Sequence, residues 1–427
     1  MCRRAALLLS LTAALFGGGA RLAAQALELA ELERAALESS PLVTEAEARR
    51  DAALALAEGA GVAGDPMLEL WARNLLPELT DRADTTAALE VEIVQPVRYP
   101  GKREAVRALA AAELGIAQAE LDQIRRGIVA QVRRAFAALG AADREQRSLG
   151  EAHELLELLS ATARARFATG QEGALAVLEA ELALDEHDLL LDKVFAGFVA
   201  ERARLAALAG ARAETLPLLV GARPEPDFPV VEGPLPIDEE APRFVTARRR
   251  IAAAERRVEL ARLDRKPDFG LGGGFFWPEG GDPALMAKVG VELPFFRRRR
   301  AEPRIRAAEA EVAAERAALE ALELEARAEA VRWGAERDRL ERALARLAGA
   351  VIPRTSVALD AARAAFLEGR LPFSRLLELQ NDWLHARVEL ALAEAARFTI
   401  WAEWQELAPS PTKSPEATPP APTEVQP

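Results

Sequence analysis

Two stretches of the sequence decide the fold, and they are copies of one another. Residues 164–179 read RARFATGQEGALAVLE, and residues 363–378 read RAAFLEGRLPFSRLLE. Gly170 of the first copy aligns with Gly369 of the second without a gap. A glycine just past a run of helix-forming residues is typical of a helix C-cap. The two stretches therefore predict two helical hairpins, one turning at Gly170 and the other at Gly369.

Long helical patterns extend outward from both turns, over Arg98–Ala209 and Phe296–Ala408. The first arm of each hairpin, beginning near residue 101 or 300, is about 68 residues long, which is roughly 100 Å at 1.5 Å per residue. Its apolar residues step by three and four, the spacing of a coiled-coil seam. In the first copy these residues are Leu114, Ala117, Leu121, Ile124 and Ile128. The second copy repeats the seam with one interruption, at Glu315.

Shorter elements precede each hairpin. A helix begins at Ser40-Pro41 and a second at Ala241-Pro242, since proline suits the first helical position. Apolar residues then alternate with polar residues or glycines at period two, which predicts half-buried strands. The predicted strands lie near residues 67–75, 86–95, 268–277 and 284–293. Lengths near 10 residues suit a tilted crossing of hydrocarbon.

The order of helix, two strands and long hairpin occurs twice, so the chain contains an internal duplication. The predicted fold is mostly α with a small β part. The predicted segments are a signal peptide (1–26), repeat 1 (27–214), a Pro-rich linker (215–236), repeat 2 (237–408) and a disordered tail (409–427).

The first 26 residues have the three parts of a secretory signal. Arg3 and Arg4 form a basic start, an apolar run too short to span a bilayer follows, and Ala24-Gln25-Ala26 is an Ala-x-Ala cleavage site. We expect cleavage after Ala26. Cys2 precedes the apolar run, so the protein is not expected to be a lipoprotein. We expect no transmembrane helix in the mature chain.

Composition argues against several classes of function. The formal net charge of -12 disfavours nucleic acid as a partner. No nucleophile–base pair, zinc spacing or phosphate loop is present, so we predict no enzyme, no cofactor and no metal site. His187 lies among consecutive acidic residues that spread around a helix instead of converging. Neither His153 nor His385 is expected to form part of a metal site.

Four strands cannot close a barrel, and open strand edges are not tolerated in lipid. We therefore expect the chain to supply its strands to a barrel shared with other copies.

The sequence resembles the TolC family of outer-membrane efflux channels over nearly the whole mature chain. The resemblance depends on the duplicated order of elements and on a set of short motifs. These motifs are Ser40-Pro41, Pro66 and Pro267 before the strands, Gln95-Pro96 followed by Pro100-Gly101-Lys102-Arg103, and the turns Phe167–Gly170 and Phe366–Gly369 followed by Val-Leu-Glu or Leu-Leu-Glu.

The resemblance implies a homotrimer with a shared trimeric outer-membrane barrel and a periplasmic tunnel of helices. It also implies a passive conduit that receives substrates from an inner-membrane pump of the RND type through a periplasmic adaptor (membrane fusion) protein. The stretch around Gln95 looks most like the branch that serves heavy-metal cation pumps, and a drug-exporting branch is the alternative.

In this family the tunnel narrows near the hairpin turns, where acidic residues are common. The matching positions are Glu179, with Glu181 nearby, Arg375 and Glu378. Arg375 departs from the acidic pattern, and an ion pair with Glu378 at i, i+3 could hold the closed state. The alternative is that these four are ordinary solvated helix residues.

Basic residues follow each strand pair. They are Arg98, Lys102 and Arg103 in the first repeat, and Arg297, Arg298, Arg299 and Arg300 in the second. Such clusters can contact lipid phosphates at a membrane surface. They can equally be solvated helix starts. The competing function for the whole chain is a periplasmic coiled-coil adaptor or scaffold without a pore.

Overall fold

A computed structural model of the chain describes residues 28–73, 88–171, 173–216, 224–278, 281–292 and 297–409. They divide into two compact units. Unit 1 comprises Met1–Ser39, Gln131–Asp227 and Leu340–Thr399, and unit 2 comprises Ser40–Ala130, Phe228–Arg339 and Ile400–Pro427. The predicted signal peptide, the tail after Pro409, and residues 217–223 of the predicted linker lie outside the described residues.

Repeat 1 contains four α-helices and a short 3-10 helix among its described residues. These are α1 (Leu29–Ser39), α2 (Pro41–Gly59), α3 (Lys102–Ala168), α4 (Ala174–Leu208) and η2 (Ala213–Thr215). Repeat 2 contains α5 (Pro242–Leu263), α6 (Arg297–Arg346), the π-helix η3 (Leu347–Val351), α7 (Ile352–Leu367) and α8 (Phe373–Trp404). Proline is the first residue of α2 and of α5, where its missing N–H has no intrahelical acceptor to lose. The sequence analysis did not predict α1.

The first arm of the second hairpin differs from its prediction as one long helix. In repeat 1 the arm is the unbroken 67-residue α3, whereas in repeat 2 it is divided into α6, η3 and α7. The physical reason is Pro353, which has no N–H to donate and stands where repeat 1 has Glu154. The N–H of Ile352 bonds instead to the carbonyl of Leu347, five residues back, which widens the helix locally.

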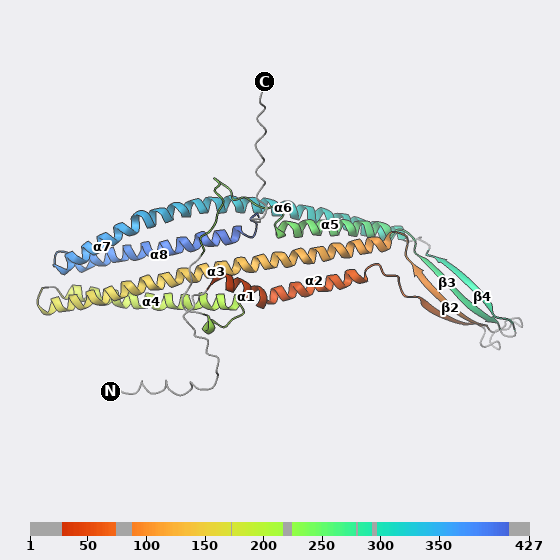
Figure 1. Cartoon of the computed structure of the whole chain (residues 1–427), viewed down its shortest axis with the longest axis horizontal. Helices are drawn as coiled ribbons and strands as arrows, with labels where there is room; N and C mark the ends of the chain where they lie inside the picture. The colour runs from red at the N-terminus through yellow and green to blue at the C-terminus, as the bar shows by residue number, and fades with distance from the viewer. Residues whose placement is uncertain are drawn as a thin grey trace, which may run out of the picture. The chain divides into compact units, whose positions relative to one another are not determined.

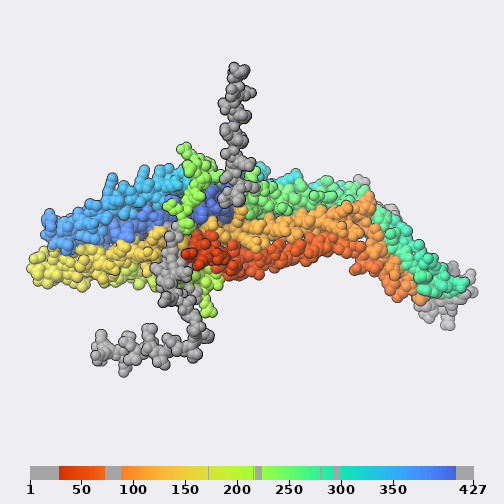
Figure 2. All heavy atoms as spheres, viewed as in Figure 1, coloured from red at the N-terminus to blue at the C-terminus, as the bar shows by residue number. Residues whose placement is uncertain are grey.

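The four strands lie in unit 2 and form one antiparallel sheet in the order β1-β2-β3-β4. They are β1 (Met67–Arg73), β2 (Ala88–Val97), β3 (Phe269–Pro278) and β4 (Ala284–Val291). Each is within two or three residues of its predicted range, although residues 74–75, 86–87 and 293 are outside the described part. The central pair, β2 and β3, joins the two repeats. In Figure 2 the orange surface of repeat 1 adjoins the teal surface of repeat 2 at the end of the chain where the sheet lies.

Unit 1 contains the two hairpin turns, with α4 beside α3 and α8 beside α7 (Figure 1). Both hairpins contribute to one apolar core near the turns. Its buried residues are Leu156, Leu159, Ala163, Ala180 and Ala183 from repeat 1, and Leu359, Ala362, Phe366, Phe373 and Leu376 from repeat 2. Phe366 meets Phe373 edge-on, with ring centroids 5.9 Å apart. The helical content, the small sheet and the repeated elements confirm the predicted fold class.

Candidate functional site

The sheet has one apolar face. Because side chains alternate along a strand, residues directly opposite each other share a face. Leu70 is opposite Val91, Val91 is opposite Phe275, and Phe275 is opposite Leu285. Ten large side chains on this face are between 40% and 78% exposed within the chain: Leu68, Leu70, Leu89, Ile93, Leu271, Phe275, Trp277, Leu285, Val289 and Val291. A contiguous exposed apolar surface of this kind marks contact with a partner or with lipid.

The opposite face carries charges and glycines, together with the apolar side chains of Met67 and Trp71 on β1 and Phe276 on β3. Glu69 is opposite Glu92, and Glu92 is opposite Gly274 of β3. The ammonium of Lys288, on β4, lies 3.0 Å from Oε2 of Glu92 and 3.6 Å from Oε2 of Glu69. A Cβ atom at Gly272 would lie 2.7 Å from Oε1 of Glu92. The absence of a side chain there gives Glu92 a path across β3 to Lys288.

This ion cluster also indicates how the sheet bends. Glu69 and Lys288 lie on the two outermost strands, three inter-strand spacings or about 14 Å apart, with a further two-residue offset along the strands. Two extended side chains do not span that separation on a flat sheet. Their contact therefore requires the sheet to twist or curve along the line that joins these two residues.

The two outer strands each have a single hydrogen-bonded neighbour among the described residues: β1 pairs with β2, and β4 pairs with β3. Each presents a row of backbone groups that a further strand could pair with.

The predicted basic cluster after β2 divides into a buried lysine and exposed arginines. The Lys102 side chain is 5% exposed, and its ammonium donates to both carboxylate oxygens of Asp268 at 2.9 and 3.0 Å. It donates also to the carbonyl of Lys266 at 3.1 Å. Lys102 thus ties the start of α3 to the start of β3, and its three donors are used within the protein.

The remaining cluster residues have exposed side chains where the structure describes them. Arg98, Arg103, Arg299 and Arg300 are exposed. Arg103 donates through Nε to the carbonyl of Gly61 at 2.7 Å, and its two terminal nitrogens take no part in that bond. The side chains of Arg297 and Arg298 lie outside the described part. Lipid contact by the exposed arginines stays a prediction.

Both hairpin turns are closed by the same backbone arrangement. Gly170 and Gly369 adopt φ values of 73° and 74°, in the left-handed region that glycine enters without a Cβ clash. The N–H of Gln171 bonds to the carbonyl of Arg166 at 2.9 Å, and the N–H of Arg370 bonds to that of Ala365 at 2.8 Å. Each glycine N–H also bonds to the carbonyl three residues back, Gly170 to Phe167 at 3.0 Å and Gly369 to Phe366 at 2.9 Å. Together these bonds form a Schellman motif at both turns.

Arg166 links the two turns. Its Nη1 donates to the carbonyl of Phe366 at 2.7 Å, and its Nη2 donates to the carbonyl of Leu367. Its guanidinium lies 5.2 Å from the centroid of the Phe366 ring. A cation at a helix C-terminus is favoured by the helix dipole, so Arg166 stabilises the end of α7 from the neighbouring hairpin.

The four predicted gate residues lie just beyond the turns. Arg375 and Glu378 form an i, i+3 ion pair, with side chains 56% and 61% exposed. Glu181 pairs with Arg164 of α3 at 3.0 Å, and Glu179 is half-buried. The structure brings Arg375 together with Glu378 but pairs Glu181 with a different arginine. A role for these residues in gating stays a prediction.

A pair of histidines was missed by the sequence analysis. His153 on α3 and His187 on α4 face each other, with ring centroids 6.3 Å apart. The signal that could have found them is their equal spacing from the turn: each is seventeen residues from Gly170, and a hairpin places such positions side by side. Among the residues that the structure describes, no group of three His, Cys, Asp or Glu side chains is arranged to hold a metal ion.

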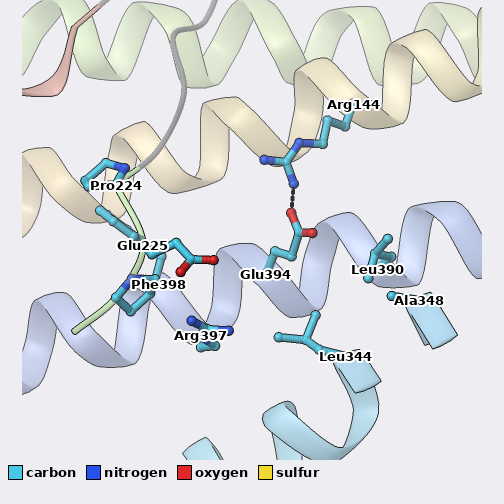
Figure 3. Close-up of a pocket in the computed structure, with 10 residues that line it drawn as sticks. Arg144, Pro224, Glu225, Leu344, Ala348, Leu390, Glu394, Arg397 and Phe398 are labelled. Carbon is cyan, nitrogen blue, oxygen red and sulfur yellow. Dashed lines mark hydrogen bonds and ion pairs between the residues drawn. The ribbon is translucent and has the colours of Figure 1, made fainter. Parts of the chain in front are cut away.

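Unit 1 also contains a cavity of about 390 Å³ between α3, α8, the end of α6 and linker residues 224–226. Figure 3 shows Arg144 and Glu394 joined by an ion pair at one wall, with Arg397 and Glu225 nearby. Its apolar walls come from Leu344, Leu390 and Phe398. Opposite charges balance across it, so it has no marked preference for a cation or an anion.

The helices that the structure describes include none with a stretch apolar and long enough to cross a bilayer.

The family of the protein follows from a match that covers most of its sequence. A family model described as "Outer membrane efflux protein" matches residues 32–211 and again residues 237–407. The chain belongs to the outer membrane efflux protein family. The predicted resemblance is confirmed, and membership in a family of channels agrees with the prediction that the protein is not an enzyme.

Solved structures of outer-membrane proteins and channels share the fold at low sequence identity. The outer-membrane channel OprN is 22% identical with a TM-score of 0.74, covering 88% of this chain and 89% of its own. The outer membrane protein VceC from Vibrio cholerae is 19% identical with a TM-score of 0.72, covering 88% and 95%. CusC is 15% identical with a TM-score of 0.75, covering 90% and 92%. No curated protein sequence matches this chain.

Proposed function

We propose that this outer membrane efflux protein is the passive conduit of a tripartite export system. Three copies would combine their four-stranded sheets into one barrel in the outer membrane, and their long helices would form a tunnel in the periplasm. An inner-membrane pump of the RND type would supply the energy and a periplasmic adaptor would join the pump to the tunnel. The cargo would be metal cations or drugs.

The observation that carries the proposal is the sheet itself. It exposes apolar side chains on one face, carries charges on the other face, and leaves β1 and β4 open to further pairing. In hydrocarbon, unpaired backbone groups are too costly, so a sheet of this kind is stable only in a closed ring. An apolar outer face and a polar inner face are what such a ring requires.

Three features support the finer assignments. Exposed Arg98, Arg103, Arg299 and Arg300 would lie at the membrane surface near lipid phosphates. Glu179, Glu181, Arg375 and Glu378 would line the periplasmic entrance. Export would use the secretory signal of residues 1–26, cleaved after Ala26.

The test is made on protein expressed from the full-length gene. Fractionation should place it in the outer membrane, the detergent-purified particle should have the mass of three mature chains, and planar bilayers should show discrete conductance steps. Recovery in the soluble periplasmic fraction would support the adaptor or scaffold alternative. Replacing Glu179, Glu181 and Glu378 with glutamine should change conductance or ion selectivity, and unchanged channels would remove the entrance assignment.

A further inference from the structure

The imidazole pair of His153 and His187 lies in a part of the first hairpin for which the proposed function has no role. His187 is only 6% exposed. Neither of its ring nitrogens has a hydrogen-bond partner within the described residues, and Nδ1 of His153 is likewise buried without one. A buried polar group without a partner is uncommon and carries a free-energy cost, so its presence calls for an explanation.

The second repeat shows that packing alone does not require histidines there. At the same offset that aligns Gly170 with Gly369, Ile352 stands in place of His153 and Ala386 in place of His187. Ala386 is 5% exposed, so this position is buried in both hairpins. An apolar pair serves the second hairpin, whereas the first carries two groups that can take up a proton.

The two imidazole rings have different charged groups around them. His153 has Asp188 at 3.5 Å from Nδ1 and Glu157 at 3.6 Å from Nε2, so two carboxylates lie beside its ring. Burial lowers the pKa of His187, the charge of His153 lowers it further, and Asp188 opposes both effects. On neighbouring turns, Arg387 of α8 is already paired with Glu151 of α3. Those two charges balance one another and offer His187 no free carboxylate.

We propose that His153 and His187 form an acid-sensitive element that loosens the packing of α3 against α4 when the surrounding compartment falls below about pH 6. His187 binds a proton more weakly in the packed hairpin than in an opened one. Between its unfolded and its folded pKa the opened state therefore holds more protons, and the packed state loses stability as the pH falls. Well above the usual histidine value of about 6.5, His187 is neutral in both states and the packing is unaffected.

Hydrogen exchange measured by mass spectrometry on the full mature chain in detergent tests the proposal. Amide protection is compared at pH 7.5 and pH 5.5, after correction for intrinsic exchange, in residues 183–194 and in the equivalent residues 382–393. In wild type, exchange in 183–194 should rise by up to about tenfold per pH unit below pH 6.5, while 382–393 should not change. The readout concerns the hairpin only, so it does not depend on whether the protein conducts ions.

Two variants separate the imidazole pair from general acid effects. His187→Leu keeps a side chain of similar size without a titratable group and should abolish the acid-induced rise. His153→Gln removes the repelling charge and should reduce the rise without abolishing it, which also serves if His187→Leu does not fold. Wild-type protection that is unchanged by acid, equal loss in both hairpins, or a full acid response in His187→Leu would each overturn the proposal.

Discussion

Gly170 and Gly369 follow long helices and have positive φ values, unlike the glycines inside those helices. No atom lies within 4 Å of a Cβ built on Gly170, so its constraint is conformational and not steric. We expect Gly170→Ala to lower stability by about 1 kcal/mol, because an L-residue at φ near +73° is strained. The midpoint of thermal unfolding in detergent measures this.

Gly150 is the matched control for that substitution. It lies within α3, and a Cβ there also meets no atom within 4 Å. Gly150→Ala should raise stability by about 0.5–1 kcal/mol, because alanine loses less conformational entropy than glycine in a helix. Equal effects at the two positions would mean that the left-handed turn is not the source of the strain.

At the level of single residues, sequence reasoning succeeds where the chemistry is local. A left-handed turn selects glycine, so Gly170 and Gly369 could be predicted from the letters around them. The contact of His153 with His187 depends instead on the rotation of two helices about their own axes. Equal spacing from Gly170 places the two histidines at the same level of the hairpin, but it does not supply that rotation. The same is true of Arg166 reaching the end of α7.

The glycines of strand β3 differ in how much space a side chain would have. A Cβ at Gly274 would lie 2.1 Å from the carbonyl oxygen of Val91, whereas a Cβ at Gly270 would make an ordinary contact of 3.5 Å with Val94. Gly274→Ala should therefore disrupt the pairing of β2 with β3, at a cost of about 1–3 kcal/mol. Gly270→Ala should be tolerated. Thermal stability of the purified oligomer distinguishes the two, and indistinguishable variants would contradict the close approach.

The attribution of the π-helix η3 to Pro353 can be tested by removing the proline from repeat 2 and by adding one to repeat 1. Pro353→Ala restores an N–H, so α6 and α7 should merge into one helix with a gain of order 1 kcal/mol. The reciprocal change in repeat 1, Glu154→Pro, should interrupt α3 and cost roughly 3 kcal/mol. A structure of each variant shows whether the interruption moves with the proline, and a π-helix retained in Pro353→Ala would contradict its assigned cause.

At the level of elements, periodicity predicts whether a segment is a helix or a strand, and which face is apolar, better than it predicts where the segment begins and ends. Period-two alternation located all four strands and separated their apolar from their polar sides. The division of α6 from α7 was missed because a proline inside a long helical pattern was not weighed against Glu154 at the equivalent position. Helix α1 was missed because its eleven residues adjoin the predicted cleavage site and were not considered separately.

For the whole molecule, the two faces of the sheet predict opposite outcomes for the same added charge. Val289 lies on the apolar face and is 72% exposed. Val289→Lys should cost about 2–4 kcal/mol if that face contacts hydrocarbon. The yield of trimer recovered from the outer membrane measures the loss.

Met286, on the polar face of the same strand, provides the control. It is opposite Gly274, on the side that bears Glu92 and Lys288. Met286→Lys should assemble close to normally because its ammonium would face water. A larger defect at Met286 than at Val289 would reverse the assignment of the faces.

The number of copies and the partners are properties that one chain does not determine. The sequence and the single-chain sheet both indicate an incomplete ring, because four strands leave two open edges. The proposed trimer would depend on contacts between copies, and no pattern within one repeat identifies the surfaces that would make them.

The pairing of β2 with β3 has a consequence for the origin of the protein. It joins the second strand of one repeat to the first strand of the other. In a closed ring, β4 of one copy would meet β1 of the next in the same second-to-first relation. Each contact between two chains would thus have the same strand order as the contact between the two repeats of one chain. Three chains of two repeats each would then be equivalent to six chains of one repeat each. An ancestral gene encoding one repeat could have built the same cylinder as a hexamer before fusion.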